Sequence, residues 1–341
     1  MLLWTPAYIL WTKWVLNMDF KLGFGPMSYE VIDILTSYAK SNQRPLMLIA
    51  SRNQVDVNSG YVTTTKGLAK SISPNVSEYL MVCRDHCGPY FLDQEKSLTL
   101  PQAIKATKLT IEADIENGFD LIHIDTSRCD QPYQVADELF NFCLRLNPKV
   151  KFEFGTEENV GVTASIKNYQ NDVKFAGQFP NMEFVVAQTG SLTMEDRQVG
   201  SFDIAMVKKL VGYAERFGVK LKEHNADYLT SDQILMRKQS GVHACNIAPQ
   251  LGVIQTKLLL SMCSDLGINS VDFQQKVLNS QRWKKWIVDG DDSVKVCIAG
   301  HYCFNSIEYK ELIKSIGYEK FYDKLREEIS HCMDLYYSNL C

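Results

Sequence analysis

Short apolar runs alternate with amphipathic stretches along most of the chain. The runs are rich in β-branched, aromatic and leucine residues, as in "LMLIA" from Leu46 and "FVVAQ" from Phe184. Between the runs, apolar residues recur at helical spacing, as in "SYEVIDILTSYAK" from Ser28. This alternation predicts βα units arranged around a parallel sheet.

The number of runs then indicates the architecture. The candidate strands number eight: 20–24, 46–50, 79–83, 121–125, 151–155, 184–188, 221–225 and 243–247. Two of the intervening helices are expected to close on Gly118 and Gly218, because glycine favours the left-handed conformation that ends many helices. Eight alternations predict an α/β fold of the (β/α)8 TIM-barrel type. The alternative is a doubly wound open sheet, whose usual G-x-G-x-x-G turn is missing, since "GFGPMS" from Gly23 lacks the last glycine.

Three segments follow from this count. Residues 1–18 form an apolar N-terminal segment, 19–268 the barrel, and 269–341 a helical C-terminal extension. The first segment has no positively charged start and is interrupted by Pro6, which argues against a signal peptide or a membrane span. We expect it to pack on the barrel or on a partner. The extension has apolar residues at helical spacing and forms either a subdomain or a cover over the barrel mouth.

Composition narrows the range of partners. Apolar residues make up 45% of the 341 residues, which provides a sizeable core, and the formal net charge is only −4. A charge this small predicts no nucleic-acid surface and no polybasic membrane patch. The ten cysteines show no C-x-x-C spacing. In a chain of this length, that pattern favours reduced, buried thiols and a cytoplasmic location.

Polar and ionisable residues follow almost every predicted strand, where barrel enzymes place their chemistry. The residues of interest at these ends are Ser51, Asn53, Gln54, Asp85, His86, Asp125, Glu153, Glu157, Glu158, Gln188, His224, Asp227 and Asn246. Two histidines and several carboxylates at one mouth suit a divalent cation. Such a cation polarises a carbonyl and stabilises an enediolate, while nearby carboxylates move protons. We assign the uncharged polar ends, with Asp125 and Asp227, to substrate binding.

Each of these residues also has a structural interpretation. His86 and His224 could cap or support neighbouring elements, although two histidines at one mouth strengthen the metal interpretation. His123 lies inside a strand, where we expect a core histidine. Glu153 alternates with two phenylalanines, so it can point inward toward a metal and needs a partner there. His243 begins a strand, at the end opposite to the expected chemistry.

For the remaining candidates, the spacing in the sequence favours a structural role over a catalytic one. Glu157 and Glu158 are typical of a solvated turn. His301 and His331 are expected to be surface or packing residues in the extension. Cys83 and Cys87 flank the Asp-His pair but have no neighbour in sequence that would clearly lower a thiol pKa.

Five motifs resemble one known family. "IASRNQVDVNSGYV", "CRDHCGP", "FDLIHIDTS", "GTEEN" and "EHNADYLT" occur in order between about residues 45 and 260. Together they resemble the class II D-tagatose-1,6-bisphosphate aldolase family, and most closely its large accessory type, described as the non-catalytic subunit. That family is similar to the zinc-dependent class II fructose- and tagatose-bisphosphate aldolases. The resemblance therefore implies a barrel, a divalent metal (zinc in that family) and a sugar or sugar-phosphate substrate.

The resemblance also implies residue roles. It makes Asp85 the proton-transfer acid and His86 and His224 zinc ligands. It makes Glu153 a second metal-contacting carboxylate and either Glu157 or Glu158 the base that deprotonates the donor ketose. A segment that helps to hold the donor phosphate in the catalytic enzymes resembles Asn246-Ile247-Ala248-Pro249.

The chain departs from the pattern of the catalytic enzymes at three places. Their third zinc histidine should fall near the end of the sixth strand, where this chain has Gln188 and Thr189. After the seventh-strand histidine, Asn225 and Asp227 replace Gly and Ser. Pro249 replaces the last Thr of the phosphate segment. An acidic Asp227 near that segment would repel a phosphate unless a cation intervenes.

Three hypotheses about function follow. The first is a metal-dependent aldolase-type lyase that acts on a ketose or ketose phosphate through a metal-stabilised enediolate, in carbohydrate metabolism or sugar biosynthesis. The second is a non-catalytic accessory subunit that stabilises a partner aldolase. The third is a metal-assisted sugar epimerase or isomerase, which uses the same chemistry without carbon–carbon cleavage. Self-association or a partner aldolase subunit is compatible with each hypothesis.

Overall fold

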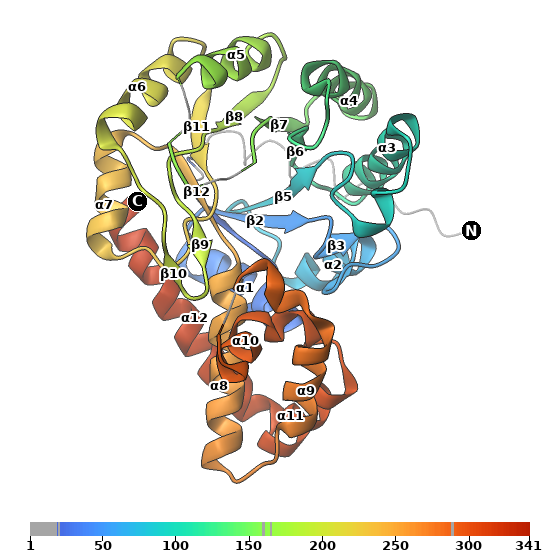
Figure 1. Cartoon of the computed structure of the whole chain (residues 1–341), viewed down its shortest axis with the longest axis vertical. Coiled ribbons are helices and arrows are strands. Elements are labelled where there is room, and N and C mark those ends of the chain that lie inside the picture. Colours follow the sequence, from blue (N-terminus) through green and yellow to red (C-terminus); the bar gives the residue numbers. More distant parts are fainter. Residues whose placement is uncertain (1–18, 20, 159–160, 164–165, 288–289) are drawn as a thin grey trace.

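The eight predicted strands form one closed barrel (Figure 1). The computed structural model describes residues 19, 21–158, 161–163, 166–287 and 290–341, so the predicted segment 1–18 lies outside the described residues. The barrel strands are β1 (Leu22–Phe24), β2 (Leu46–Ser51), β5 (Leu80–Cys87), β6 (Leu121–Asp125), β7 (Lys151–Gly155), β8 (Met182–Val186), β11 (Lys220–Glu223) and β12 (Ala244–Ile247). They are all parallel and pair in the order β1-β12-β11-β8-β7-β6-β5-β2. The (β/α)8 prediction is confirmed.

Helices cover the outside of the barrel. They are α1 (Tyr29–Asn42), α2 (Thr65–Ile72), α3 (Leu100–Glu116), α4 (Pro132–Leu146), α5 (Ile166–Ala176), α6 (Ile204–Glu215), α7 (Ser231–Ser240) and α8 (Pro249–Asp265). Local signals set several of their ends. The Ser28 side chain accepts a hydrogen bond from the Val31 amide and caps α1. Gly118 and Gly218 follow α3 and α6 with φ of 84° and 70°, as their sequence positions predicted.

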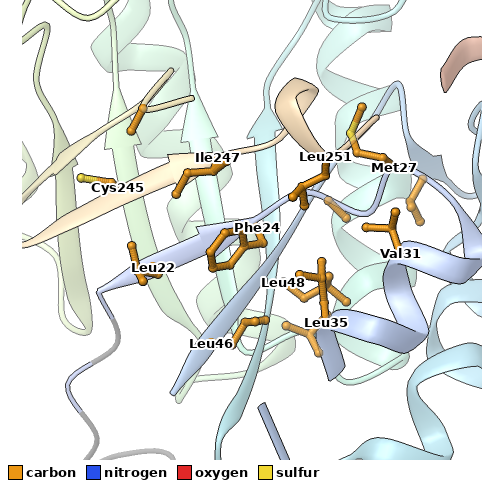
Figure 2. Close-up of a cluster of buried hydrophobic side chains, with 14 of the residues drawn as sticks. Leu22, Phe24, Met27, Val31, Leu35, Leu46, Leu48, Cys245, Ile247 and Leu251 are labelled. Carbon is orange, nitrogen blue, oxygen red and sulfur yellow. The ribbon is translucent and has the colours of Figure 1, made fainter. Parts of the chain in front are cut away.

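The barrel wall separates two buried regions, one between the strands and the helices and one inside the barrel. The outward-facing residues of the strands pack against the helices, and Figure 2 shows one such contact, where Leu22, Phe24 and Leu48 meet side chains of α1 and α8. Their inward-facing residues fill the barrel with a separate apolar cluster of Met47, Ile49, Met81, Cys83, Leu121, Phe184 and Ala244. Alternate residues of a strand point to opposite faces, so the next inward positions along the strands lie above this cluster, toward the mouth.

The extension contains α9 (Val271–Ser280), the 3-10 helix η5 (Arg282–Lys285), α10 (Asp292–Ala299), η6 (Gly300–Cys303), α11 (Ile307–Ile316) and α12 (Tyr318–Leu340). Helices α9, α10 and α11 form a lobe beside the barrel, at the bottom of Figure 1. Helix α12 returns to the barrel, where the Tyr336 hydroxyl donates to the Ala226 carbonyl (2.7 Å) and Tyr337 to that of Pro45 (2.9 Å). The extension is thus a lobe whose last helix joins the barrel's outer layer.

Short elements complete the loops at the mouth. These are the strands β3 (Val55–Asp56), β4 (Thr63–Thr64), β9 (Thr193–Met194) and β10 (Arg197–Gln198), with the 3-10 helix η4 (Asp93–Glu95). The 3-10 helix η3 (Ser73–Asn75) lies at the opposite end of the barrel, between α2 and β5. None of the helices in the described ranges is long and apolar enough to cross a bilayer. All ten cysteines fall within the described ranges, none is in a disulfide, and seven are buried.

Candidate metal and substrate site

A cavity of about 1040 Å³ opens at the C-terminal ends of the strands. Most of the residues singled out in the sequence line it: Ser51, Asn53, Gln54, Asp85, His86, Asp125, Glu157, Glu158, Gln188, His224, Asp227 and Asn246. Glu153 is the exception. His123, His301 and several cations of the extension also line this cavity.

Four side chains form a compact group at the base of the cavity. Asp85 and His86 come from β5, His123 from β6, and His224 directly follows β11. Each offers one ligand atom, and these atoms lie within 4.8 Å of one another. Three imidazoles and a carboxylate are a donor set suited to zinc or a similar divalent cation. We refer to Asp85, His86, His123 and His224 as the Asp-His cluster.

A local irregularity in β5 brings the adjacent Asp85 and His86 to the same site. Successive residues of a regular strand point to opposite faces, so two neighbours cannot normally share one. The register between β5 and β6 shifts between Arg84 and Cys87, and His86 has a positive φ of 46°. A bulge of this kind re-aims a side chain, and both residues therefore face the mouth.

The structure corrects the interpretation of His123. The sequence suggested a core histidine, but the side chain points into the barrel and its Nδ1 atom lies 3.2 Å from Asp85 Oδ1. The His86 amide lies 3.2 Å from the same nitrogen. The Nε2 atom of His123 is buried and has no hydrogen-bond partner among the described residues. Strand alternation could have indicated this position, because His123 shares a face with Asp125, two residues later.

Two carboxylates support the histidines from behind. Asp125 Oδ2 lies 2.6 Å from His86 Nδ1, and Glu153 Oε1 lies 2.6 Å from His224 Nε2. The second oxygen of Glu153 accepts a hydrogen bond from Lys222 Nζ at 2.5 Å. Partners of this type orient metal-binding imidazoles, since a contact at one ring nitrogen leaves the other free for the metal. Glu153, which we expected to contact the metal, uses both oxygens in these contacts.

The charges around Asp85 and His86 stabilise one another. Burial raises the pKa of Asp85, but His86, His224 and the contact with His123 outweigh this effect and hold it well below its usual value. Burial lowers the pKa of His86, but Asp85 and Asp125 outweigh it and raise it to about 9. The hydrogen bond to His86 likewise overcomes burial at Asp125 and lowers its pKa to about 2. Asp85 is therefore an ionised carboxylate at neutral pH.

The second histidine behaves differently. Burial lowers the pKa of His224 and outweighs the attraction of Asp85 and Glu153, which favours the neutral imidazole that binds metals. Burial raises the pKa of Glu153, but the charges of Lys222 and His123 and the contact with His224 together lower it to about 2. Glu153 thus remains ionised beneath His224.

Glu157 and Glu158 follow β7 at the side of the cavity. Asn168 donates a hydrogen bond to Glu157 Oε1 (2.7 Å), and the Gln188 side chain donates to the Glu157 carbonyl (3.1 Å). Glu158 is more exposed and pairs with Arg128 at 3.1 Å. Both residues line the cavity outside the Asp-His cluster. The carboxylate of Glu158 is already paired with the Arg128 guanidinium.

The loop after β2 is held by contacts within itself and with the segment after β5. Gln54 accepts hydrogen bonds from the Ser51 amide and hydroxyl, both at 2.9 Å. Asn53 donates to the Phe91 carbonyl at 3.1 Å. Asn246 differs from these residues, because both polar atoms of its side chain are buried without a partner in the described part of the chain. Its amide is the best substrate-contact candidate among the uncharged residues of the cavity.

Asp227 occupies the N-terminus of α8. One of its oxygens accepts hydrogen bonds from the amides of Ala248 and Gln250, each at 2.9 Å. Burial raises its pKa to about 7 despite these bonds. Amides at this end of a helix commonly bind a ligand's phosphate. Here the side chain of Asp227 accepts the hydrogen bonds of these amides. The amide groups of the segment from Asn246 to Gln250 that face this side chain therefore have a partner without a phosphate.

Comparison with known proteins identifies the fold. No family model matches the sequence. A protein described as a probable tagatose 6 phosphate kinase from Sinorhizobium meliloti 1021 has a similar structure, with a TM-score of 0.77 and 16% identity over 94% of this chain and 100% of the other. A putative fructose-1,6-biphosphate aldolase from Coccidioides immitis matches with a TM-score of 0.54 and 14% identity, over 98% and 96% of the two chains.

A third match is the fructose-bisphosphate aldolase from Campylobacter jejuni, with a TM-score of 0.53 and 12% identity over 94% of this chain and 92% of the other. At these identities the similarity concerns the fold, and the chain has the aldolase-like TIM-barrel fold.

Proposed function

We propose that the protein is a metal-dependent lyase of the aldolase type that acts on a ketose or ketose phosphate. The observation that carries the proposal is the Asp-His cluster, because it puts three imidazoles and an ionised carboxylate within 4.8 Å at the mouth of an aldolase-like barrel. The partnerless, buried Nε2 atom of His123 fits a site that a cation would complete.

His86, His123 and His224 would hold the cation. This assignment revises the expected ligand set, because His123 replaces the histidine missing from the sixth strand and Glu153 becomes a support for His224. A bound divalent cation would polarise the ketose carbonyl and stabilise the negative charge that develops on its oxygen. Zinc suits these donors best.

Side chains of the protein would move the protons. In the cleavage direction, the ionised carboxylate of Asp85 accepts the proton of the hydroxyl group whose carbon becomes the aldehyde. In the reverse direction, Asp85 returns that proton to the aldehyde oxygen. Glu157 is the preferred base for the α-proton of the donor ketose, since Arg128 already pairs with Glu158.

Two alternative functions were open from the sequence, an accessory subunit and an epimerase or isomerase. The accessory-subunit hypothesis rested on the missing histidine of the sixth strand, and His123 weakens that argument by supplying a third imidazole to the cluster. An epimerase or isomerase would use the same groups without carbon–carbon cleavage, so its products differ from those of a lyase.

Metal analysis combined with substitution tests the proposal. We expect one divalent ion per chain in the purified protein by plasma mass spectrometry, and loss of most of it in His123→Ala. His331→Ala is the matched control, because His331 is exposed on α12. A metal-free wild-type protein, or a His123→Ala variant that keeps its ion, would contradict the proposal.

A product assay then separates lyase from epimerase. The metal-loaded protein should release an aldehyde from at least one member of a panel of ketoses and ketose phosphates, detected with a coupled dehydrogenase. Glu157→Gln should lower turnover more than Glu158→Gln. Conversion of one ketose into another without aldehyde release would assign the site to the epimerase class.

A further inference from the structure

A side chain of the protein already occupies the N-terminus of α8. Asp227 is 1% exposed and accepts hydrogen bonds from two amides there, those of Ala248 and Gln250. A ligand phosphate at this place would meet a carboxylate and amides whose hydrogens are already used. An anionic group on a substrate therefore needs another part of the cavity.

The extension supplies cations to a different wall of the cavity. Arg282 and Lys285 of η5 line the cavity, and Arg128 from the segment after β6 lines it with them. The backbone directly after η5 is tied to the β9–β10 hairpin, since the Glu195 amide donates to the Trp286 carbonyl at 3.0 Å. We call Arg128, Arg282 and Lys285 the basic wall.

Aromatic side chains hold these cations in place. The Arg282 guanidinium lies 5.1 Å from the centre of the Tyr302 ring, and the Tyr302 hydroxyl accepts a hydrogen bond from Trp286 at 3.1 Å. Lys285 lies over the Trp286 ring at 4.5 Å. Cations stacked on aromatic faces are restrained in position without being neutralised.

Two cations of the basic wall differ from the third in having no direct ion-pair partner. Arg128 pairs with Glu158 at 3.1 Å. Arg282 and Lys285 make no ion pair with a carboxylate among the described residues, although both face the same cavity. Burial and the neighbouring charges of Arg128 and Arg282 lower the pKa of Lys285, whereas Asp85 opposes this shift. The charges of Arg128, Arg282 and Asp85 therefore all act on Lys285 within the same cavity.

We propose that the basic wall binds a phosphate monoester at the end of the substrate remote from the reacting carbonyl. The two free positive charges of Arg282 and Lys285 match the charge of a phosphate at neutral pH, about −1.5 to −2. The planar guanidinium can bind two phosphate oxygens, and the ammonium adds a point charge. That the phosphate is attached to a ketose rests on the proposed function, whereas the anion site itself does not.

Calorimetric titration tests the site without turnover. The ligand is inorganic phosphate, and D-fructose 6-phosphate and D-fructose form a second, matched pair. We expect Arg282→Gln and Lys285→Gln each to weaken phosphate binding about tenfold to a hundredfold, as for loss of a charged hydrogen-bonding group. Arg282→Lys should be intermediate. Lys276→Gln, in α9 and outside the cavity, should bind as the wild type does.

Each outcome is decisive for the site. Preference for the phosphorylated sugar that disappears in the Arg282→Gln/Lys285→Gln double variant, with an unchanged melting temperature, supports it. Wild-type binding of phosphate by the double variant, an equal loss in Lys276→Gln, or tighter binding of gluconate than of phosphate would overturn it. Phosphate binding without aldehyde release from any ketose would contradict the proposed lyase function but still support the phosphate site. Cleavage of unphosphorylated ketoses at the same rate by the wild type and the double variant would support the lyase function but contradict the phosphate site.

Discussion

The two faces of the barrel wall use buried charge in opposite ways, and β5 shows both within two consecutive residues. Arg84 points outward and is fully buried. It makes four hydrogen bonds, two to Asp114 at 2.6 Å and one each to the carbonyls of Ala50 and Val55. Asp85 points inward, where its neighbours are the imidazoles of the Asp-His cluster.

The hydrogen-bond networks of Arg84 and Asp85 differ in whether the protein supplies all of their partners. The outward network is closed, because the protein alone supplies the partners of the guanidinium. The inward network stops at the cavity, with one imidazole nitrogen of His123 left without a partner among the described residues. A closed buried network serves the fold, whereas an open one beside a cavity is a candidate for binding or catalysis.

The largest effect is expected from breaking the closed network. Asp114→Ala leaves the Arg84 guanidinium buried without its carboxylate, which should lower the free energy of unfolding by about 3–5 kcal/mol. Urea denaturation measures this loss. The double variant Arg84→Met/Asp114→Leu removes both charges and should recover most of the stability. Equal losses in the single and double variants would show that the pairing is not the cause.

A smaller effect is expected at the inner support of the cluster. Glu153→Gln removes the charge behind His224 and should weaken metal binding by roughly 10–100-fold, as loss of such partners does elsewhere. Because it also leaves the Lys222 ammonium buried, the double variant Glu153→Gln/Lys222→Met is the control. It should regain stability and still bind metal weakly. If it regained full affinity, Glu153 would act through stability alone.

The mildest test varies pH. His86 has a pKa of about 9, above its usual 6.5, so without metal it contributes stability that is complete below about pH 6.5 and lost as the pH rises through 9. A cation must displace this proton, so metal affinity should rise about tenfold per pH unit in that interval. Asp125→Asn should move the rise to lower pH, since it removes a charge that favours protonation. An affinity independent of pH would exclude His86 as a ligand.

Much of the fold could be predicted because it depends on local patterns. Each of the eight strands is an apolar run between polar turns, and glycine at positions 118 and 218 follows the helices it was expected to end. The strand ends then indicated Asp85, His86 and His224, because parallel strands bring their carboxyl ends to one mouth. Alternation likewise indicated that Glu153 points inward.

The parts that could not be predicted depend on contacts between distant segments. Alternation puts His123 on the same face of β6 as Asp125, but only the packed barrel puts its Nδ1 atom 3.2 Å from Asp85 on the neighbouring strand β5 and so makes it a member of the cluster. Glu153 supports His224 because Lys222, 69 residues away in sequence, takes its other oxygen. No local pattern encodes which of the two inward carboxylates, Asp85 or Glu153, contacts the histidines at the cavity and which pairs with a buried lysine.

The sequence by itself therefore determined the barrel, its strand order along the chain and the mouth at which ionisable residues gather, because hydrophobic periodicity and turn chemistry act over a few residues. The tertiary structure alone decided the membership of the Asp-His cluster, the capping of α8 by Asp227 and the approach of Arg282 and Lys285 to the cavity. The physical reason is that side-chain partners are chosen by distance and burial in the closed barrel, and these depend on the packing of the whole chain.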